Sequence, residues 1–427
     1  MEKKAAAQEC YKMKFNWKHI LLFLAVLGPG IITASVDNDA GGIATYSIAG
    51  AHFGYSLLWT LIPITIVLII VQEMAARMGA VTGKGLADLI RENFGLKITL
   101  WITIGLLIAN IATTIAEFAG IAAAAGMFGI SKYLIVPFAA IIIFWLVLRS
   151  NYKTLEKIFL ILSLFYVTYI ISGFMAKPDW GLALKSTLVP SFQFNANYLL
   201  VFIGVIGTTI TPWMQFYLQS SIVEKGIRTD NYKYSKWDVI IGCFITNIVS
   251  FFIIVASAAT IFVAGIQIVD ATDAAHALAP LAGSYAAALF AFGLFSAALF
   301  GAFILPLSTS FYICEGFGWE SGVNKKFREA PQFYVLFSAI ILISAAVILI
   351  PKINLIYLML ASQVINGILL PVVLVSMLKL TNNKKLMGEY TNSKIYNFFV
   401  WIAIVGIGAL SILLVLTTIF PNLFAFI

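Results

Sequence analysis

The stretch GPGIITASVDNDAGGIATYSIAG, residues 28–50, places two carboxylates and two adjacent glycines inside an apolar run of membrane-spanning length. Residues 37–39, Asp-Asn-Asp, fall near the middle of that run, where an ionised carboxylate costs roughly 3 kcal/mol or more. Gly41 and Gly42 permit the helix to unwind at little steric cost. Unwinding at membrane depth frees backbone carbonyls, which then need a partner. The stretch therefore predicts a buried polar site at a broken helix.

The composition predicts that lipid is the solvent of this chain. Of the 427 residues, 61% are hydrophobic and 11% are charged, whereas a soluble domain carries about 25% charged residues. A spanning helix needs about 20 residues. Eleven apolar segments meet that need, at residues 19–50, 54–77, 98–126, 133–149, 155–176, 197–224, 237–265, 284–314, 332–350, 354–378 and 396–420. We expect an all-α integral membrane protein, with residues 1–18 as a cytoplasmic tail and residues 19–427 as one transmembrane domain.

The net charge of +8 follows the expected topology. The Lys and Arg residues gather at the N-terminus and in alternate loops, with Lys132, Lys177, Lys185 and Lys352 as the exceptions among the 27. The positive-inside rule then predicts a cytoplasmic N-terminus and, after eleven spans, an extracellular C-terminus in the cell membrane. We therefore expect the lipid bilayer as a partner, no nucleic acid, and no obligatory protein partner.

A second break is expected in span 6, in GTTITPWMQFYLQSS, residues 207–221. Pro212 leaves the carbonyl four residues earlier without its helical partner, and Thr209, Thr211 and Gln215 place oxygens around it. Taken alone, this is also the pattern of a proline kink satisfied by threonine hydroxyls. Five spans separate the two breaks, however, and broken helices at matching positions of two halves are typical of inverted-repeat transporters. We expect the LeuT-type fold of five plus five spans, with an eleventh helix added.

The first break offers hard oxygen ligands that suit a metal cation. Asp39 supplies a carboxylate and Asn38 an amide oxygen. The alternative is a kink whose Asp pairs with a buried cation, but no Lys or Arg lies well inside any span. Asp37 is either a vestibule residue or a cap of the broken helix. Glu117, a single acid in a span of small residues, is either a proton relay or a buried neutral acid.

Span 10 adds two polar residues at membrane depth. Gln363 and Asn366 lie three residues apart, so they share one face of a helix. Polar residues at that depth face the interior of a helix bundle. Either a place in the site or an interhelical hydrogen bond explains them.

At several motifs the chain resembles the Nramp divalent-metal transporters. GPG, ATYSIAG and FGYSLLW resemble span 1 and the start of span 2 of that family. TPWMQFYLQSS resembles its span 6 with the Met-Pro-His motif, SQVINGILLP its span 10, and IATTIAE its span 3. The resemblance covers roughly residues 19–378 and agrees with eleven helices. It implies the LeuT-type fold and transport of divalent cations.

The departures from the family pattern concern the metal ligands. The family motif Asp-Pro-Gly-Asn reads Asp-Ala-Gly-Gly here, at residues 39–42, so a side-chain ligand is lost and space is expected at Gly42. The family methionine aligns with Thr211. Because a thioether favours soft metals while oxygen favours Mg²⁺ and Ca²⁺, this change favours Mg²⁺. The family's proton-pathway histidines fall at Trp213 and Gln219, and its second span 3 acid at Thr114.

Together these departures make the chain most similar to the Nramp-related magnesium transporters. A wider site with one firm carboxylate suits partly hydrated Mg²⁺, which dehydrates reluctantly. We expect uptake of Mg²⁺ and Mn²⁺ as substrates, without proton coupling and without a cofactor. The candidate metal site comprises Asp39, Asn38, Gly42, Thr208, Thr209, Thr211, Trp213, Gln215, Gln363 and Asn366, with Asp37 and Glu117 as candidate vestibule or relay residues.

Three alternatives stay open. One is a proton-coupled Mn²⁺/Fe²⁺ carrier of the same family, against which the missing methionine argues. The second is a sodium-coupled amino-acid symporter of the same fold, in which a fixed Asp beside the half-helix terminus would repel the substrate's carboxylate. The third is a non-transporting scaffold, which leaves the paired breaks unexplained. The sequence has no nucleophile–base pair, phosphate loop or cofactor motif, so no enzyme is expected.

Overall fold

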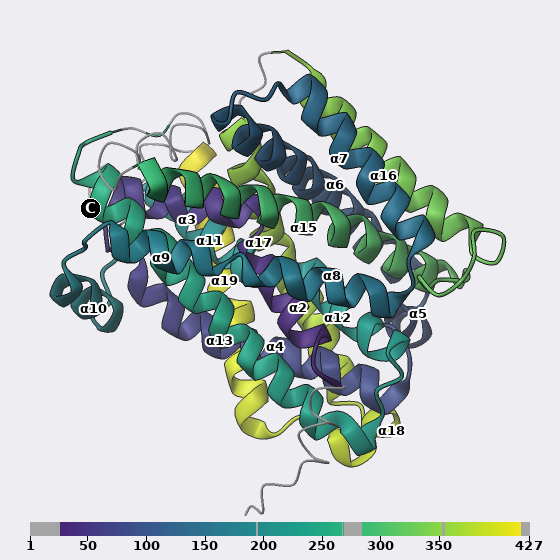
Figure 1. Cartoon of the computed structure of the whole chain (residues 1–427). Coiled ribbons are helices and arrows are strands. Elements are labelled where there is room, and N and C mark those ends of the chain that lie inside the picture. Colours follow the sequence, from purple (N-terminus) through teal and green to yellow (C-terminus); the bar gives the residue numbers. More distant parts are fainter. Residues whose placement is uncertain (1–25, 194, 267, 269–283, 352–354, 420–427) are drawn as a thin grey trace, which may run out of the picture.

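The computed structural model describes residues 26–193, 195–266, 268, 284–351 and 355–419. The expected tail, residues 1–18, and the first residues of the first span lie outside this part of the chain. The described part is helical and contains no strand (Figure 1). Its elements are α2 (Pro29–Ser35), η1 (Val36–Asn38), α3 (Ala40–Phe53), η2 (Leu58–Thr60), α4 (Leu61–Thr82), α5 (Leu86–Phe94), α6 (Leu96–Met127), α7 (Lys132–Arg149), α8 (Tyr152–Leu164), α9 (Val167–Met175), α10 (Trp180–Leu188), α11 (Ala196–Thr209), α12 (Pro212–Glu224), η3 (Thr229–Asn231), α13 (Tyr232–Ser257), η4 (Ala258–Phe262), α15 (Ser284–Phe317), α16 (Pro331–Leu349), α17 (Leu355–Thr381), α18 (Lys384–Met387), η5 (Gly388–Tyr390) and α19 (Lys394–Ile419).

The described residues contain the expected spans, the first of them only from residue 26 onward. Ten helices there are long and apolar enough to cross a membrane, with α8–α9 and α11–α12 each counted as one span. The first expected span is the broken pair α2 and α3. Large apolar side chains such as Trp101, Leu134 and Val405 are exposed on the outer helices, as a lipid-facing surface requires.

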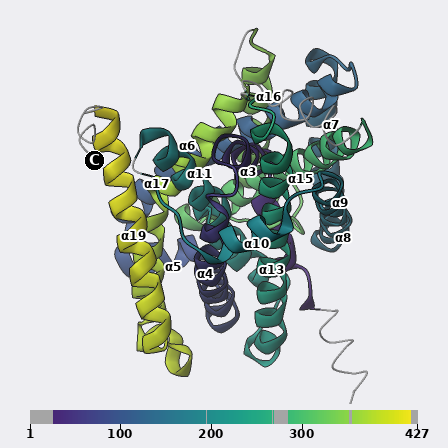
Figure 2. The ribbon, with the colours of Figure 1, turned by 90° about the vertical axis from the view of Figure 1, so that its left-hand side faces the viewer.

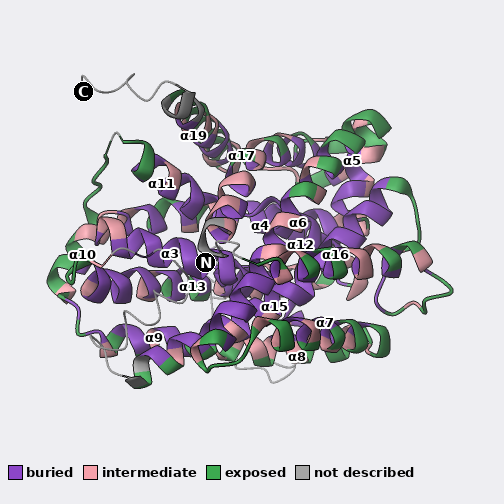
Figure 3. Cartoon of the chain, turned by 90° about the horizontal axis from the view of Figure 1, so that it is seen from above, coloured by how far each residue is buried: buried purple, intermediate pink, exposed green. Residues whose placement is uncertain are grey.

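The two broken spans lie at the centre of the bundle. α3 packs against α11, α13 and α17, and α2 packs against α13 and α12. Viewed from above, buried residues gather on central helices such as α3, α13 and α15, while exposed residues mark α5, α7 and α8 (Figure 3). The eleventh helix, α19, stands at the edge of the bundle (Figure 2). This arrangement brings the two predicted breaks together away from lipid.

Both breaks occur where the sequence predicts them. In span 1, the turn η1 follows α2, and Asp39 then adopts an extended backbone with φ −66° and ψ 179° before α3 begins. In span 6, α11 ends at Thr209, and Ile210 and Thr211 leave the helical region. Pro212 then starts α12, a position where its missing N–H costs nothing.

The start of α2 is fixed by polar contacts that the sequence did not reveal. The Asp238 carboxylate on α13 accepts hydrogen bonds from the amides of Gly28 at 3.1 Å and Gly30 at 2.6 Å. A side chain at Gly30 would lie 2.6 Å from the backbone nitrogen of Val239, so glycine lets α2 and α13 approach closely. The short helix is thereby held against α13.

Candidate metal site

The Asp39 carboxylate joins three parts of the site. Its Oδ1 accepts from the amide of Gly42 at 2.6 Å, which caps α3, and from Nε2 of Gln363 on α17 at 3.3 Å. A Cβ at Gly41 would lie closer than 3.0 Å to that Nε2, so the missing side chain gives Gln363 its place. Sequence reasoning placed Asp39 and Gln363 in one site, and the structure brings them together.

Asp37 differs from Asp39 because its carboxylate has no partner. The residue is 1% exposed, and neither oxygen has a hydrogen-bond donor in the described part of the protein. Of the two interpretations of Asp37, vestibule residue or helix cap, the cap is not found, since Asp39 caps α3. Its backbone carbonyl accepts from Oγ1 of Thr208 at 3.3 Å, which links the two breaks.

The expected space at Gly42 is not found in this structure. A Cβ there would lie closer than 3.0 Å to the backbone oxygen of Asp37 and 2.7 Å from Oγ1 of Thr208. The two breaks approach each other so closely that backbone and hydroxyl fill the room that a side chain would take. Glycine at this position therefore permits close contact between the broken helices.

Glu117 reaches the same place from α6. Its Oε2 accepts from the amide of Ala40 at 3.1 Å, directly after Asp39, and its Oε1 is buried without a partner. A Cβ at Gly301 of α15 would lie 2.5 Å from Oε2, so the carboxyl fits against a glycine. The contact is compatible with a proton relay and with a buried neutral acid.

Asn38 points to a different helix from Asp39. Its Nδ2 donates to Oγ1 of Thr246 at 2.6 Å and its Oδ1 accepts from Ser250 at 2.9 Å, both on α13. The structure therefore does not bring the Asn38 side chain to the Asp39–Gln363 group. In this conformation its amide holds the turn η1 against α13.

The span 6 residues surround the second break. Oγ1 of Thr211 donates to the carbonyl of Thr208 at 3.4 Å, the carbonyl that Pro212 was expected to leave without its partner. Thr209 shares a 2.7 Å hydrogen bond with the Tyr46 hydroxyl. Nε2 of Gln215 donates to the Thr211 carbonyl at 3.3 Å, while its Oε1 has no partner.

Trp213 and Asn366 complete the expected group. Trp213 is fully buried with its ring 6.2 Å from that of Tyr217, as expected for packing, although its Nε1 has no acceptor. Nδ2 of Asn366 donates to Oε1 of Gln363 at 3.3 Å and to Oγ1 of Thr113 at 3.0 Å. The span 10 pair thus faces the bundle interior, and it makes the interhelical hydrogen bond that was one of its two interpretations.

Sequence reasoning missed several polar partners of this group. Tyr46, Thr113, Thr246 and Ser250 are buried and hydrogen-bonded to candidate residues. A signal was present, because Thr246 and Ser250 are four apart in one span, and such polar pairs share a helix face. Which face points to the site, however, depends on the rotation of each helix in the bundle.

The site is rich in hydrogen-bond acceptors without donors. Among the candidate site residues, five buried oxygens have no hydrogen-bond partner in the described part of the protein: Oδ1 and Oδ2 of Asp37, Oε1 of Glu117, Oε1 of Gln215 and Oδ1 of Asn366. Among the described residues, no Lys or Arg forms an ion pair with Asp37 or Asp39. Buried charges in proteins are paired or coordinate metals.

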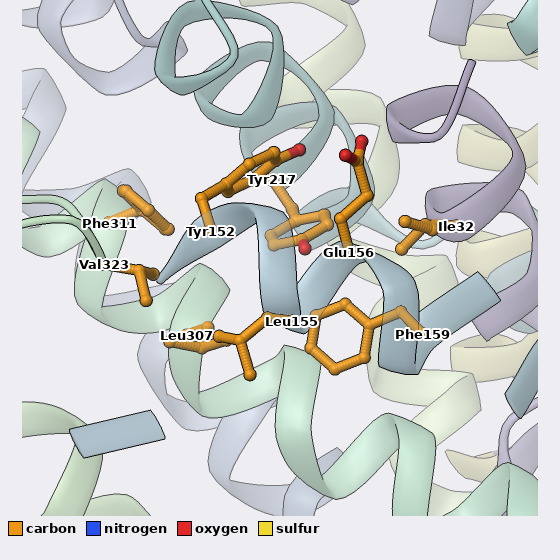
Figure 4. Close-up of a pocket in the computed structure, with 9 residues that line it drawn as sticks. All are labelled: Ile32, Tyr152, Leu155, Glu156, Phe159, Tyr217, Leu307, Phe311 and Val323. Carbon is orange, nitrogen blue, oxygen red and sulfur yellow. The ribbon is translucent and has the colours of Figure 1, made fainter. Parts of the chain in front are cut away.

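The conformation is closed around this group. None of the candidate side chains is more than 2% exposed. On the α2 side, a cavity of about 10 Å³ between α2, α8, α12 and α15 has room for about one water molecule (Figure 4). It is lined by Ile32, Tyr152, Leu155, Glu156, Phe159, Tyr217, Leu307, Phe311 and Val323. An ion at the breaks would therefore be enclosed by protein.

Comparison with known proteins identifies relatives over nearly the whole chain. The sequence model described as "Natural resistance-associated macrophage protein-like", Nramp, matches residues 30–417. The divalent metal cation transporter MntH of Bacillus subtilis (strain 168) is 30% identical over 411 residues, covering 92% of each chain. MntH of Verminephrobacter eiseniae (strain EF01-2) is 26% identical, covering 93% of this chain and 90% of its own.

Solved structures agree with the fold. The manganese transporter of Eremococcus coleocola, in complex with an aromatic bis-isothiourea compound, superposes with a TM-score of 0.79 at 22% identity, covering 96% of this chain and 90% of its own. MhsT in complex with L-phenylalanine gives a TM-score of 0.60 at 14% identity, covering 91% and 97%. These likenesses confirm the LeuT-type fold, with spans 1 and 6 broken, in a multi-pass membrane protein.

Proposed function

Since this chain belongs to the Nramp family and is a membrane transporter of divalent metal cations, we propose that its main substrate is Mg²⁺. Mg²⁺ is taken up as a partly hydrated ion, with Mn²⁺ as a second substrate and without a coupled proton. The chain then belongs to the Nramp-related magnesium transporters. Its metal ions are cargo, and no cofactor takes part.

The excess of acceptors at the site carries this proposal. Water molecules bound to a cation donate their hydrogens outward, so a hydrated ion needs acceptors around it. The orphan oxygens of Glu117, Gln215 and Asn366 are such acceptors, and each is fully buried. Mg²⁺ keeps several waters and binds through one or two carboxylates. Asp39 supplies the firm carboxylate.

The absence of sulfur at one position supports the choice of ion. Thr211 stands where the family methionine is expected, at the start of α12 and 1% exposed. A hydroxyl oxygen is a hard ligand and gives little preference for Mn²⁺ over Mg²⁺. Mn²⁺ remains a substrate in this proposal, since a solved relative is called a manganese transporter.

The absence of proton coupling rests on residues that cannot titrate. Thr114 donates to the carbonyl of Asn110 at 2.7 Å, and Gln219 donates to the carbonyl of Lys84 at 2.8 Å. Both are neutral side chains occupied by backbone contacts. Trp213 replaces the remaining family histidine. The expected proton pathway therefore lacks two histidines and one of its two span 3 acids, and Glu117 is the acid that remains.

A second candidate, a proton-coupled Mn²⁺ carrier, is favoured by one observation. Glu117 contacts the amide of Ala40 beside Asp39, and its second oxygen is unpartnered. An acid next to the metal carboxylate can exchange a proton when the ion arrives. The experiment below therefore measures proton and metal movement together.

The orientation belongs to the same proposal. Lys and Arg residues accumulate on the side of the loops that follow α4, α7, α12, α15 and α17. The positive-inside rule places that side, with residues 1–18, in the cytoplasm and the C-terminus outside the cell membrane. Residues 19–427 form one transmembrane domain, and α2 then lies on the cytoplasmic side of the breaks.

Uptake into proteoliposomes tests the proposal. Liposomes containing the protein and a Mg²⁺-sensitive dye are exposed to Mg²⁺, with Mn²⁺ and Ca²⁺ in parallel and a pH dye in matched vesicles. We expect Mg²⁺ and Mn²⁺ entry with no internal acidification, and no entry with Asp39→Ala. Mn²⁺ entry with acidification and without Mg²⁺ entry would establish the second candidate instead.

A further inference from the structure

We propose that Asp37 is a second carboxylate of the cation site, so that Asp37 and Asp39 together neutralise one divalent ion. This inference rests on the proposed function and extends it, because one firm carboxylate at Asp39 leaves a charge of +1 on a bound Mg²⁺. The two residues lie on either side of Asn38: Asp37 is the middle residue of η1, and Asp39 directly precedes α3. The break in span 1 would then present both charges to the same ion.

The contrast among the buried acids carries the inference. Asp39 accepts two hydrogen bonds, Glu117 accepts one from Ala40, and Asp238 accepts backbone bonds at the start of α2. Asp37 is as buried as these acids, with 1% exposed, yet neither of its oxygens accepts a hydrogen bond from any residue that the structure describes. Burying a carboxylate without any partner is costly, so such a group needs a ligand.

Within the described ranges, no Lys or Arg lies within ion-pairing distance of Asp37. Asp39 lies two residues from Asp37, and two ionised carboxylates that share a site repel each other. A divalent ion between them removes this repulsion and satisfies the unpartnered oxygens.

The turn that carries Asp37 is held in place although its carboxylate makes no bond. Asn38 donates to Thr246 and accepts from Ser250, which ties the turn to α13. The backbone carbonyl of Asp37 accepts from Thr208 of α11. The backbone that carries the carboxylate is therefore held before the ion arrives, and little ordering of the backbone is needed on binding. In this arrangement Asn38 is a positioning residue.

The test compares three substitutions of equal size in the full-length protein. Asp37→Asn removes the charge at Asp37, Asp39→Asn removes it at Asp39, and Asp179→Asn removes an exposed carboxylate that caps α10 far along the chain. Mg²⁺ and Mn²⁺ binding are measured by titration calorimetry and uptake in proteoliposomes. Melting temperature is recorded with and without Mg²⁺. Asp37→Glu serves as the charge-conserving variant.

We expect Asp37→Asn to weaken Mg²⁺ binding by at least about tenfold, the loss typical of disturbing groups around a metal. Its melting temperature without Mg²⁺ should equal or exceed that of the wild type, because an unpartnered buried charge has been removed. Mg²⁺ should then add less stability than in the wild type. Asp37→Glu should recover part of the binding, and Asp179→Asn should change nothing.

Any other outcome contradicts either the role of Asp37, the proposed site or the choice of Mg²⁺. Wild-type Mg²⁺ binding by Asp37→Asn, with binding lost in Asp39→Asn, removes Asp37 from the site and leaves the proposed function intact. A melting temperature lowered without Mg²⁺ shows a structural role and also overturns the inference. If Asp39→Asn retains uptake as well, the proposed site itself is wrong. If only Mn²⁺ binds, the choice of Mg²⁺ fails, and the Mn²⁺ titrations still decide the role of Asp37.

Discussion

Nε2 of Gln363 donates to Oδ1 of Asp39 at 3.3 Å, across space that exists because residue 41 is glycine. The contact joins α17 to the break between α2 and α3. The same oxygen accepts a hydrogen bond from the Gly42 amide, so one carboxylate oxygen both caps α3 and orients the Gln363 side-chain amide. The two glycines therefore have different roles: Gly41 leaves room for the Gln363 side chain, and Gly42 allows close contact between the two breaks.

The two glycines are expected to differ in their tolerance of alanine. At Gly41 the added methyl meets the flexible end of Gln363, which can move, so we expect transport to fall several-fold with the fold intact. At Gly42 the methyl meets the backbone oxygen of Asp37, which cannot move alone, so we expect a loss of about 1–3 kcal/mol in unfolding free energy and no transport. Melting curves and Mg²⁺ uptake measure both. Equal effects of Gly41→Ala and Gly42→Ala would contradict this account.

Asp238 is expected to matter for stability rather than for ion choice. Its carboxylate accepts hydrogen bonds from backbone amides at the start of α2, including one from the Gly30 amide to Oδ2 at 2.6 Å. Asp238→Ala should therefore cost about 1–2 kcal/mol in unfolding free energy. The Mg²⁺/Mn²⁺ preference of the folded fraction should not change. Asp179→Ala, which removes an exposed cap on α10, is the matched control and should cost less. A changed ion preference in Asp238→Ala would place this residue in the ion pathway.

The sequence predicted the breaks because their causes are local. Asp39 caps α3 through the amide three residues later, and Pro212 cannot continue the preceding helix, so neither feature depends on the rest of the bundle. The burial of Gln363 and Asn366 was predictable for a related reason, since polar side chains in an apolar span turn toward the interior.

The site contacts that the sequence did not predict depend on how the helices are rotated against each other. Asn38 looked like a ligand beside Asp39, yet adjacent side chains point in different directions, and Asn38 meets Thr246 on α13. Gly42 looked like a source of space, but the room is filled by residues 37 and 208, which are far apart in sequence. Such contacts between distant segments leave no local signal in the chain.

Glu117 gives a direct test of coupling. Glu117→Gln keeps an oxygen that can accept from the Ala40 amide, so the fold should be retained. We expect Mg²⁺ entry without internal acidification in both the wild type and this variant, measured with Mg²⁺ and pH dyes. Acidification in the wild type that disappears in Glu117→Gln would show that this acid still couples metal and proton movement.

Thr211→Met tests whether the missing sulfur selects the ion. Thr211 is 1% exposed, and among the described residues its hydroxyl makes a single long hydrogen bond, at 3.4 Å to the Thr208 carbonyl. Removing the hydroxyl should therefore cost little stability. A thioether at this position should strengthen Cd²⁺ and Mn²⁺ binding relative to Mg²⁺, because sulfur favours softer metals. We expect a relative change of about tenfold, or 1.4 kcal/mol, in competition titrations.

Thr211→Leu separates the effect of side-chain size from the effect of sulfur, because leucine is about as large as methionine but has no thioether. If the sulfur acts as a ligand, Thr211→Met should shift the Cd²⁺/Mg²⁺ preference and Thr211→Leu should not. If both variants shift it equally, the volume of the closed site selects the ion. An unchanged preference in both would mean that a hydrated ion never touches residue 211. Selection would then depend on the acceptors that hold the ion's water, and Gln215→Leu, which removes the orphan oxygen one turn along α12, should weaken Mg²⁺ binding more than Cd²⁺ binding.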